Sequence, residues 1–448
     1  MSKANVPADE VEYSVWRATK FYVPLLIQAF SQSLTYPLVA TVVSRGTNGI
    51  DDYTAFALGQ TVMFMVGALG SGLVTTGMVF GRTVEGLRNF AKMNYAMALF
   101  LLGVQLLICT APLDRFVFCT LLELPDGLWQ TARNTLLYCQ LMQFAFFLRN
   151  IPFVVLFNAH NSMAANLATM FRIVVTAAAA PLFVKAGWTG PYWGCVAITA
   201  PVYLEMLLAR KFAARYLKAL PHAEAPAASV FRQLRFTLPL SIGGVLQAAA
   251  PFMVGAFVSR AADAVRMYAI HIVTVGAANP FGFAALRMQA VVVAFRPRPD
   301  GERALMRFAL MSGAVLALPL LALGIPEVGR WYFHIVQNLP LESLDFAATA
   351  ILAFALLPVL QSFRGWTEGV AACRRRPSII MAGQLTNLLS LVLVLYVLLR
   401  RGVQGCYIGV CAILLGICCT LLIENLLVRF ARSGLASEKD GASGRQLQ

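Results

Sequence analysis

Four arginines lie inside apolar stretches that are long enough to span a membrane: Arg149, Arg172, Arg287 and Arg364. Each lies eight to ten residues from the nearest basic or polar loop, roughly 12 to 15 Å deep at 1.5 Å per residue. A charge at this depth costs at least about 2.5 to 3.5 kcal/mol on insertion scales and usually marks a functional site. Because guanidinium groups bind carboxylate and phosphate oxygens in pairs, this layer predicts a basic cavity for a multiply charged anion.

Other polar residues in apolar stretches add to this candidate site. Glu368 follows Arg364 by one helical turn, so the two side chains can pair on one helix face. Gln28, Gln32 and Gln247 could line the same cavity or form hydrogen bonds between helices. The predicted substrate-binding set is Arg149, Arg172, Arg287, Arg364, Glu368, Gln32, Gln247, His271 and Asn387.

A structural role is the alternative interpretation of the same arginines. Glu205 and Glu424 also lie in apolar stretches, and each could neutralise an arginine without any ligand. The guanidinium groups could also cap carbonyl groups of interrupted helices. For a single arginine the sequence leaves both interpretations open.

No arrangement of residues in the sequence predicts catalysis. His160, His222, His271 and His334 have no nearby serine, cysteine or carboxylate in the spacing of a hydrolase or transferase, and no metal-ligand spacing occurs. We therefore expect neither an enzyme nor a bound cofactor or metal. No aspartate lies inside an apolar stretch, which argues against extrusion of organic cations, whose natural ligand in a membrane is a buried carboxylate.

The composition is that of a polytopic membrane protein. Of the 448 residues 59% are hydrophobic and only 13% are charged, with a mean hydropathy of +0.69. The first apolar run begins at Phe21 with no small-residue cleavage site behind it, so we expect it to be a retained helix and not a signal peptide. The nine cysteines are scattered through apolar runs and read as small buried side chains. The net charge of +15 arises from short loops, so nucleic acid is not an expected partner.

The apolar runs predict an all-α membrane protein of twelve transmembrane helices. The expected spans are 20–44, 55–80, 92–112, 134–157, 164–185, 191–209, 236–259, 266–295, 304–324, 346–373, 378–399 and 404–428. An even number of spans puts both termini on one side. The tails and the loops of that side hold 23 arginines and lysines, and the opposite loops hold nine, so we expect both termini in the cytoplasm.

An internal repeat divides the chain into halves. Val43-Ser44-Arg45 matches Val258-Ser259-Arg260, and the glycine and tyrosine pattern at 187–194 matches that at 402–409. Arg149 matches Arg364 at the same offset of 215 residues (364 − 149). Six spans separate equivalent positions, which predicts parallel repeats around a central site. The expected parts are a six-helix lobe at 18–211, a cytoplasmic linker at 212–234, a second six-helix lobe at 235–430 and a disordered tail at 431–448.

The sequence resembles the progressive ankylosis family, a branch of the MATE and lipid-flippase (MOP) superfamily of twelve-helix transporters. The resemblance runs from about Phe21 to Phe430, and its motifs are Pro358, Arg364 and Gly369 before Arg374 and Arg375, then Gly402-Val403-x-Gly405 with Gly409, and Pro280-x-Gly282 before Arg287. It implies two six-helix lobes around a central cavity, alternating access, and export of anions such as citrate, nucleoside triphosphates or pyrophosphate. Asn387 stands where the family would carry a basic residue.

The sequence thus predicts a monomeric anion transporter of the plasma membrane, with the lipid bilayer and a small anion as its partners. Two rival functions remain. A flippase for a lipid-linked anionic headgroup would need an apolar groove beside the arginines, and a MATE-like multidrug extruder would need buried carboxylates to outnumber them. The identity of the anion, the coupling ion and the direction of net flux stay open.

The distribution of basic residues gives a topological prediction. In a variant without the native cysteines, Ala225→Cys in the 212–234 segment is expected to react with a membrane-impermeant maleimide only after the cytoplasmic face is opened, because that segment lies among the basic loops. Thr189→Cys in an opposite loop serves as the control and is expected to react in intact cells. Labelling of Ala225→Cys from outside would reverse the assignment of every loop.

Overall fold

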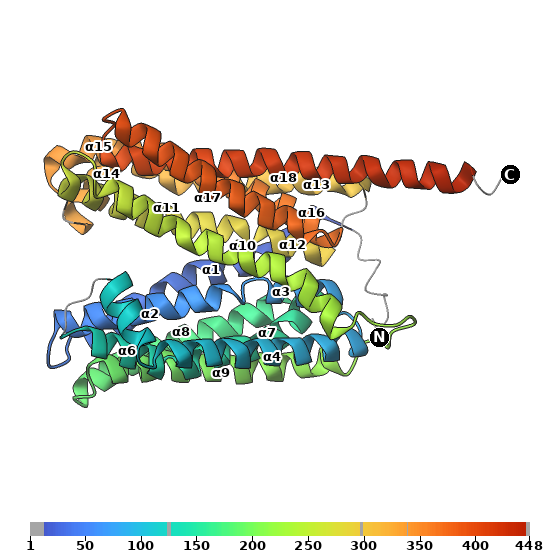
Figure 1. The fold of residues 1–448 in the computed structure, drawn as a ribbon, viewed down its shortest axis with the longest axis horizontal. Helices are drawn as coiled ribbons and strands as arrows, with labels where there is room; N and C mark the ends of the chain where they lie inside the picture. Colours follow the sequence, from blue (N-terminus) through green and yellow to red (C-terminus); the bar gives the residue numbers. More distant parts are fainter. Residues whose placement is uncertain (1–12, 123–126, 296–298, 338, 445–448) are drawn as a thin grey trace. The chain divides into compact units, whose positions relative to one another are not determined.

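The computed structural model describes residues 13–122, 127–295, 299–337 and 339–444. The described residues form helices joined by short turns, and no strand occurs among them (Figure 1). The chain divides into two compact units, Met1–Val245 and Leu246–Gln448, and each unit is described by itself.

The first unit contains nine α-helices among its described residues and the start of a tenth. A short π-helical turn, η1 (Phe116–Leu121), follows α5. The helices are α1 (Val15–Val43), α2 (Ile50–Ala68), α3 (Leu73–Phe80), α4 (Val84–Ile108), α5 (Leu113–Arg115), α6 (Trp129–Tyr138), α7 (Gln140–Asn158), α8 (Ser162–Lys185), α9 (Pro191–Leu217) and α10 (Val230–Val258), whose first half belongs to this unit.

The second unit repeats this order of elements. A π-helical turn, η2 (Arg330–Val336), and a 3₁₀ turn, η3 (Leu341–Ser343), lie between α14 and α15. Its helices are the second half of α10, then α11 (Ala264–Leu286), α12 (Met288–Phe295), α13 (Pro299–Leu323), α14 (Pro326–Gly329), α15 (Leu344–Phe354), α16 (Leu357–Cys373), α17 (Pro377–Arg400) and α18 (Gly405–Gly444).

The predicted spans correspond to these helices. Eleven helical segments of the described chain are long and apolar enough to cross a membrane, and α1, with 29 residues, corresponds to the remaining expected span. Four of the spans consist of two helices joined by a break: α2 with α3, α6 with α7, α11 with α12, and α15 with α16. Such breaks leave backbone groups that neighbouring helices must satisfy, so they lie where the units are densely packed.

The internal repeat is visible in the helix bounds. Shifting α1, α3, α4 and α8 by 215 residues reproduces both ends of α10, α12, α13 and α17. Left-handed backbone recurs at the same offset, at His160 (φ 55°) and Arg375 (φ 56°), and at Gly187 (φ 73°) and Gly402 (φ 69°). The glycines suit these turns because they lack the Cβ atom that disfavours positive φ. The predicted parallel repeat of two six-helix halves is therefore confirmed.

An equivalent close contact places a glycine against a ring in each unit. Gly194 of α9 leaves room for the side chains of Val43 and Phe56, and Gly409 of α18 leaves room for the ring of His271. Phe56 and His271 are equivalent under the repeat, since they differ by the same offset of 215. His271 thus occupies a packing position, and its imidazole is buried beside α18.

The segment between the halves is shorter than the sequence predicts. α9 continues to Leu217 and α10 begins at Val230, so only 218–229 of the expected 212–234 linker is non-helical. The linker is fastened to the start of α4: the Val84 amide donates to the carbonyl of Pro221, and His222 contacts the Glu85 carboxylate at 2.8 Å. The first turns of α10 also pack within the first unit, with the hydroxyls of Thr76 and Thr237 2.8 Å apart. For this reason the division between the units falls inside α10.

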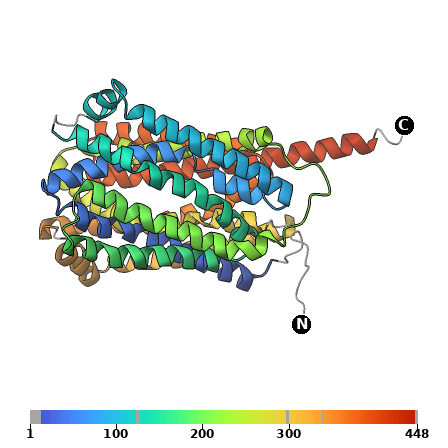
Figure 2. The same cartoon turned by 90° about the horizontal axis from the view of Figure 1, so that it is seen from below.

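The second difference concerns the carboxyl end. The sequence predicts a disordered tail over 431–448 because this segment is polar and rich in glycine and serine, but α18 continues without interruption to Gly444. In both views α18 extends past the helices of its unit (Figure 2). Residues 445–448 lie outside the described part of the chain.

The two glycine contacts give a stability prediction. Gly194→Ala and Gly409→Ala are each expected to lower the free energy of unfolding by about 1 to 3 kcal/mol, because the added Cβ would overlap Val43 and His271 respectively. Gly103→Ala on α4 is the matched control, since nothing lies within 4 Å of its Cβ position. Thermal unfolding in detergent checks this, and equal midpoints for the three variants would contradict the packing described here.

Candidate functional site

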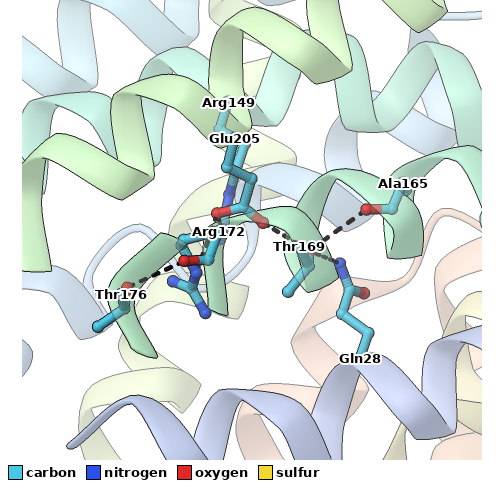
Figure 3. Close-up of polar contacts among 7 residues, drawn as sticks. All are labelled: Gln28, Arg149, Ala165, Thr169, Arg172, Thr176 and Glu205. Atoms are coloured by element: carbon cyan, nitrogen blue, oxygen red, sulfur yellow. Dashed lines mark hydrogen bonds and ion pairs between the residues drawn. The ribbon is translucent and has the colours of Figure 1, made fainter. Parts of the chain in front are cut away.

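Two arginines of the first unit meet at one carboxylate. Arg149 on α7 places Nη1 2.8 Å from Oε2 of Glu205 on α9, and Arg172 on α8 places Nε 3.5 Å from the same oxygen (Figure 3). The Glu205 side chain is fully buried. Three helices therefore contribute one charged group each to a single cluster.

The second oxygen of Glu205 is held by a chain of hydrogen bonds. The Thr169 hydroxyl on α8 donates to Oε1 of Glu205 and accepts from the Gln28 amide of α1 at 2.8 Å (Figure 3). Both oxygens of the carboxylate thus have partners, as a buried ion requires. Gln28, which the sequence placed either at a cavity or between helices, joins α1 to this cluster.

Arg149 is held by aromatic rings as well as by Glu205. Its guanidinium carbon lies 4.7 Å from the centre of the Phe146 ring and 4.9 Å from that of Phe153. Both rings come from α7, one turn before and one turn after the arginine, and such cation–π contacts are favourable when desolvated. The Arg149 side chain is 13% exposed, against 4% for Arg172. Of the two arginines, Arg149 is the one that a ligand can reach.

The helix that carries Arg149 is fixed to α4. Asn94 of α4 donates to the carbonyl of Phe147 at 2.9 Å and accepts from the amide of Asn150 at 3.2 Å. These two hydrogen bonds flank Arg149 on α7 and restrict rotation of the helix. The position of the guanidinium is consequently set by four helices: α4, α7, α8 and α9.

The second unit has its own buried charged cluster, on α16, α17 and α18. Arg364 is 1% exposed and donates from Nε to Oε1 of Glu368, one turn later, at 2.8 Å. Gln384 of α17 donates to the same oxygen at 3.1 Å. This confirms the pairing of Arg364 with Glu368 that their spacing predicts. Nη2 of Arg364 has no hydrogen-bond partner among the described residues.

Glu424 of α18 adds a second carboxylate to this cluster. It is fully buried, it packs against Gly383, and neither of its oxygens has a hydrogen-bond partner in the described chain. Glu368 and Arg364 are the charged groups that act on it electrostatically. The second cluster therefore contains two carboxyl groups and one guanidinium, whereas the first contains two guanidinium groups and one carboxyl.

The two clusters occupy equivalent helices but differ in their residues. Under the repeat Arg149 corresponds to Arg364, Thr169 to Gln384, Arg172 to Asn387, and Glu205 to Thr420. Only the first pair keeps its residue type. Thr169 and Gln384 were absent from the predicted set, although the offset of 215 applied to the neighbours of the arginines would have indicated both.

The remaining predicted residues lie apart from the two clusters. Arg287 is exposed at the break between α11 and α12, and His271 packs beneath Gly409. Asn387 is buried on α17, one turn after Gln384, with its amide oxygen against Gly416. Gln247 of α10 is half-buried, and the side chain of Gln32 lies outside the described residues. Among the described residues no group of three or more histidine, cysteine or acidic side chains could hold a metal ion.

Comparison with known proteins identifies the fold. No protein-family model matches the chain, and no curated protein matches it. Solved structures do match it over nearly their full length. A point mutant of a MATE transporter superposes with a TM-score of 0.76 at 16% identity, covering 94% of this chain and 97% of that one. A MOP superfamily transporter from Pyrococcus furiosus, described as having a binding pocket of reverse polarity that suggests a different function, superposes with a TM-score of 0.73 at 15% identity, covering 94% and 96%.

A third structure shows the same similarity. An outward-facing multidrug resistance MATE transporter of the MOP superfamily matches with a TM-score of 0.68 at 16% identity and covers 94% of this chain and 96% of that one. These identities are low, so the similarity establishes the fold alone. The chain has the twelve-helix fold of the MATE and MOP-superfamily transporters.

The buried pair of the second unit gives a stability prediction. Arg364→Ala is expected to lower the free energy of unfolding by about 3 to 5 kcal/mol, because it leaves Glu368 and Glu424 buried without a cation. Adding Glu368→Gln is expected to restore part of that loss. Chemical unfolding in detergent provides the measurement, with the exposed Arg401→Ala as the control. If Glu368→Gln gives no recovery, the pair is not the source of the defect.

Proposed function

We propose that this protein is an alternating-access membrane transporter for small multivalent anions, namely citrate-like carboxylates, nucleotides or pyrophosphate. Arg149 and Arg172 form the part of the site that lies in the first unit, and Arg364 and Arg287 are the contributions of the second. The proposal includes the plasma membrane as its location, cytoplasmic termini and a monomeric state. It also includes membership of the progressive ankylosis branch of the fold.

The observation that carries this proposal is the charge of the first cluster. Two guanidinium groups share the single carboxylate of Glu205, so the cluster holds one more positive than negative charge inside a membrane-spanning bundle. Desolvating an ion without a matching counter-ion is costly, and a structural pair would need only one arginine for one glutamate. An anionic ligand would supply the missing charge. Arg149, which is partly exposed and oriented by two rings, is suited to bind it.

The fold supports transport, and its known members support a change of charge preference. The matching structures are transporters, and the one from Pyrococcus furiosus is described as having a binding pocket of reverse polarity. Within one fold, function depends on the residues of the site rather than on the scaffold. A MOP-type transporter whose site is basic is therefore physically reasonable.

One observation favours a second function, extrusion of organic cations in the manner of a multidrug transporter. The second cluster holds Glu368 and Glu424 against one arginine, and the oxygens of Glu424 have no hydrogen-bond partner among the described residues. A buried carboxylate of this kind is a natural ligand for a cation. In this case Glu424→Gln would abolish binding of a cationic dye, and Arg149→Ala would leave it unchanged.

The proposed anion site is tested by thermal shift on the purified protein. Citrate, pyrophosphate, ATP and the cationic dye ethidium are compared at constant ionic strength, because a ligand that binds the folded state raises the midpoint. At least one of the three anions is expected to stabilise the wild type. Arg149→Ala is expected to weaken that binding by about 10- to 100-fold, since it removes one hydrogen-bonded charge.

Two further variants make the result specific. Arg149→Lys is expected to recover little of the affinity, because an ammonium lacks the planar fork that binds two oxygens at once. Arg215→Ala, at the exposed end of α9, is expected to bind as the wild type does. Stabilisation by ethidium and by none of the anions would favour the cation extruder, and undiminished anion binding by Arg149→Ala would exclude Arg149 as a ligand.

A further inference from the structure

The carboxylate of Glu205 is bound in the way that a substrate carboxylate or phosphate would be. One oxygen receives Arg149 and Arg172, and the other accepts from Thr169 (Figure 3). Guanidinium groups that share one oxygen and a hydroxyl that donates to the other form a complete anion-binding set. In this structure the set is filled by a side chain of the protein itself.

An anion that enters this set comes close to Glu205. It must bind guanidinium groups whose hydrogen-bonding capacity Glu205 already uses in part, and two negative charges within a few ångströms repel strongly where water is excluded. The cluster has room in its charge for one additional negative charge, but a multivalent anion brings more than one. The repulsion is removed if Glu205 loses its charge when the anion binds.

Glu205 is the group of this cluster that can change its charge by taking up a proton. An arginine stays protonated in proteins, and the hydroxyl of Thr169 and the amide of Gln28 do not titrate. The helices α2 and α6 also pack against α9 and carry Asp51, Asp52 and Arg133, but none of these forms an ion pair with Glu205. The charges that act on Glu205 are those of Arg149 and Arg172, which an incoming anion would engage.

We propose that Glu205 is a built-in surrogate for the substrate: it occupies Arg149 and Arg172 while the site is empty, and it releases them and takes up one proton when the anion binds. This inference rests on the proposed function, because it assumes an anion at the same arginines. The step balances as one anion and one proton taken up per site, with no covalent bond made or broken other than the new O–H bond of Glu205. The anion and the proton therefore bind together.

This linkage fixes the direction of the pH dependence. Because binding takes up a proton, acid favours binding, and the dissociation constant is expected to fall by up to tenfold for each pH unit of acidification in the range where Glu205 is ionised in the empty site and protonated in the complex. A transporter that works in this way moves the anion together with a proton. A pH difference across the membrane would then drive the anion toward the alkaline side.

Calorimetric titration of the full-length protein with citrate and with pyrophosphate tests the proposal. Each titration is run in two buffers that differ in ionisation enthalpy, which gives the number of protons taken up per anion bound. Glu205→Gln keeps the size of the side chain and an oxygen for Thr169 but cannot take up a proton. The wild type is expected to take up about one proton more than Glu205→Gln with the same anion at the same pH, so that protonation of the ligand itself cancels.

The affinities provide an independent reading. Glu205→Gln is expected to bind the anion at least tenfold more tightly at neutral pH and with a flatter pH profile, because no carboxylate competes for the arginines. Glu327→Gln, an exposed glutamate at the start of α14, is the matched control and is expected to show the proton count and the affinity of the wild type. If Glu205→Gln does not yield folded protein, the wild-type proton count decides alone, after subtraction of the protons that free citrate takes up at that pH.

The outcomes separate this inference from the function on which it rests. If citrate and pyrophosphate bind the wild type with an equal proton count in Glu205→Gln, or if Glu205→Gln binds more weakly, then Glu205 is a structural counter-ion and the inference fails while the anion site stands. If neither anion binds the wild type, and Arg149→Ala changes no ligand response, the proposed function fails and the inference fails with it.

Discussion

The requirement that a buried guanidinium be matched by negative charge governs the interior of both units. Arg172 and Arg364 are almost fully buried, and an ion in a medium of low dielectric constant is tolerated only with a counter-ion and hydrogen bonds. In the first unit this requirement draws α7, α8 and α9 together at Glu205, and through Thr169 it includes α1. In the second unit it is met mostly within one helix, because Glu368 follows Arg364 by a single turn. The same requirement thus gives a cluster between helices in one unit and a pair on one helix in the other.

The repeat provides equivalent backbones on which these different clusters lie. Helix ends, left-handed turns and the glycine contacts at Gly194 and Gly409 recur after 215 residues, because they depend on backbone geometry and close approach, which both halves must keep. The charged residues are not under that constraint. Between Arg172 and Asn387, and between Glu205 and Thr420, the type of residue changes while the helix position is kept. A duplicated scaffold can therefore give a basic cluster in one unit and an acidic one in the other.

This difference in charge is the feature that a function of the protein has to explain. The first cluster has an excess of guanidinium, and the second has an excess of carboxyl groups. Under the proposed function the first binds the anion, and Glu205 makes that binding depend on protons. Glu424, whose oxygens find no hydrogen-bond donor among the described residues, is the structural reason for retaining cation transport as the second candidate. Both interpretations assign the substrate to charged groups within the spans and leave the fold unchanged.

The sequence by itself determined the features that depend on composition and local spacing. The hydrophobic runs determined the number of spans, since crossing the hydrocarbon requires about 20 apolar residues whatever the packing. The offset of 215 determined the repeat, and a spacing of four residues determined the pair of Arg364 and Glu368. The polar composition of the tail and linker was a poorer guide, because α18 and α10 extend by helix propagation into segments that apolar patterning does not cover. Only the tertiary structure decided which charges meet: Glu205 is 56 residues from Arg149 and 33 from Arg172 in the chain (205 − 149 and 205 − 172), and their contact depends on how three helices pack. The same packing separated Arg287 and His271 from the clusters, since residues at one depth in a membrane can lie on different helices and face different neighbours.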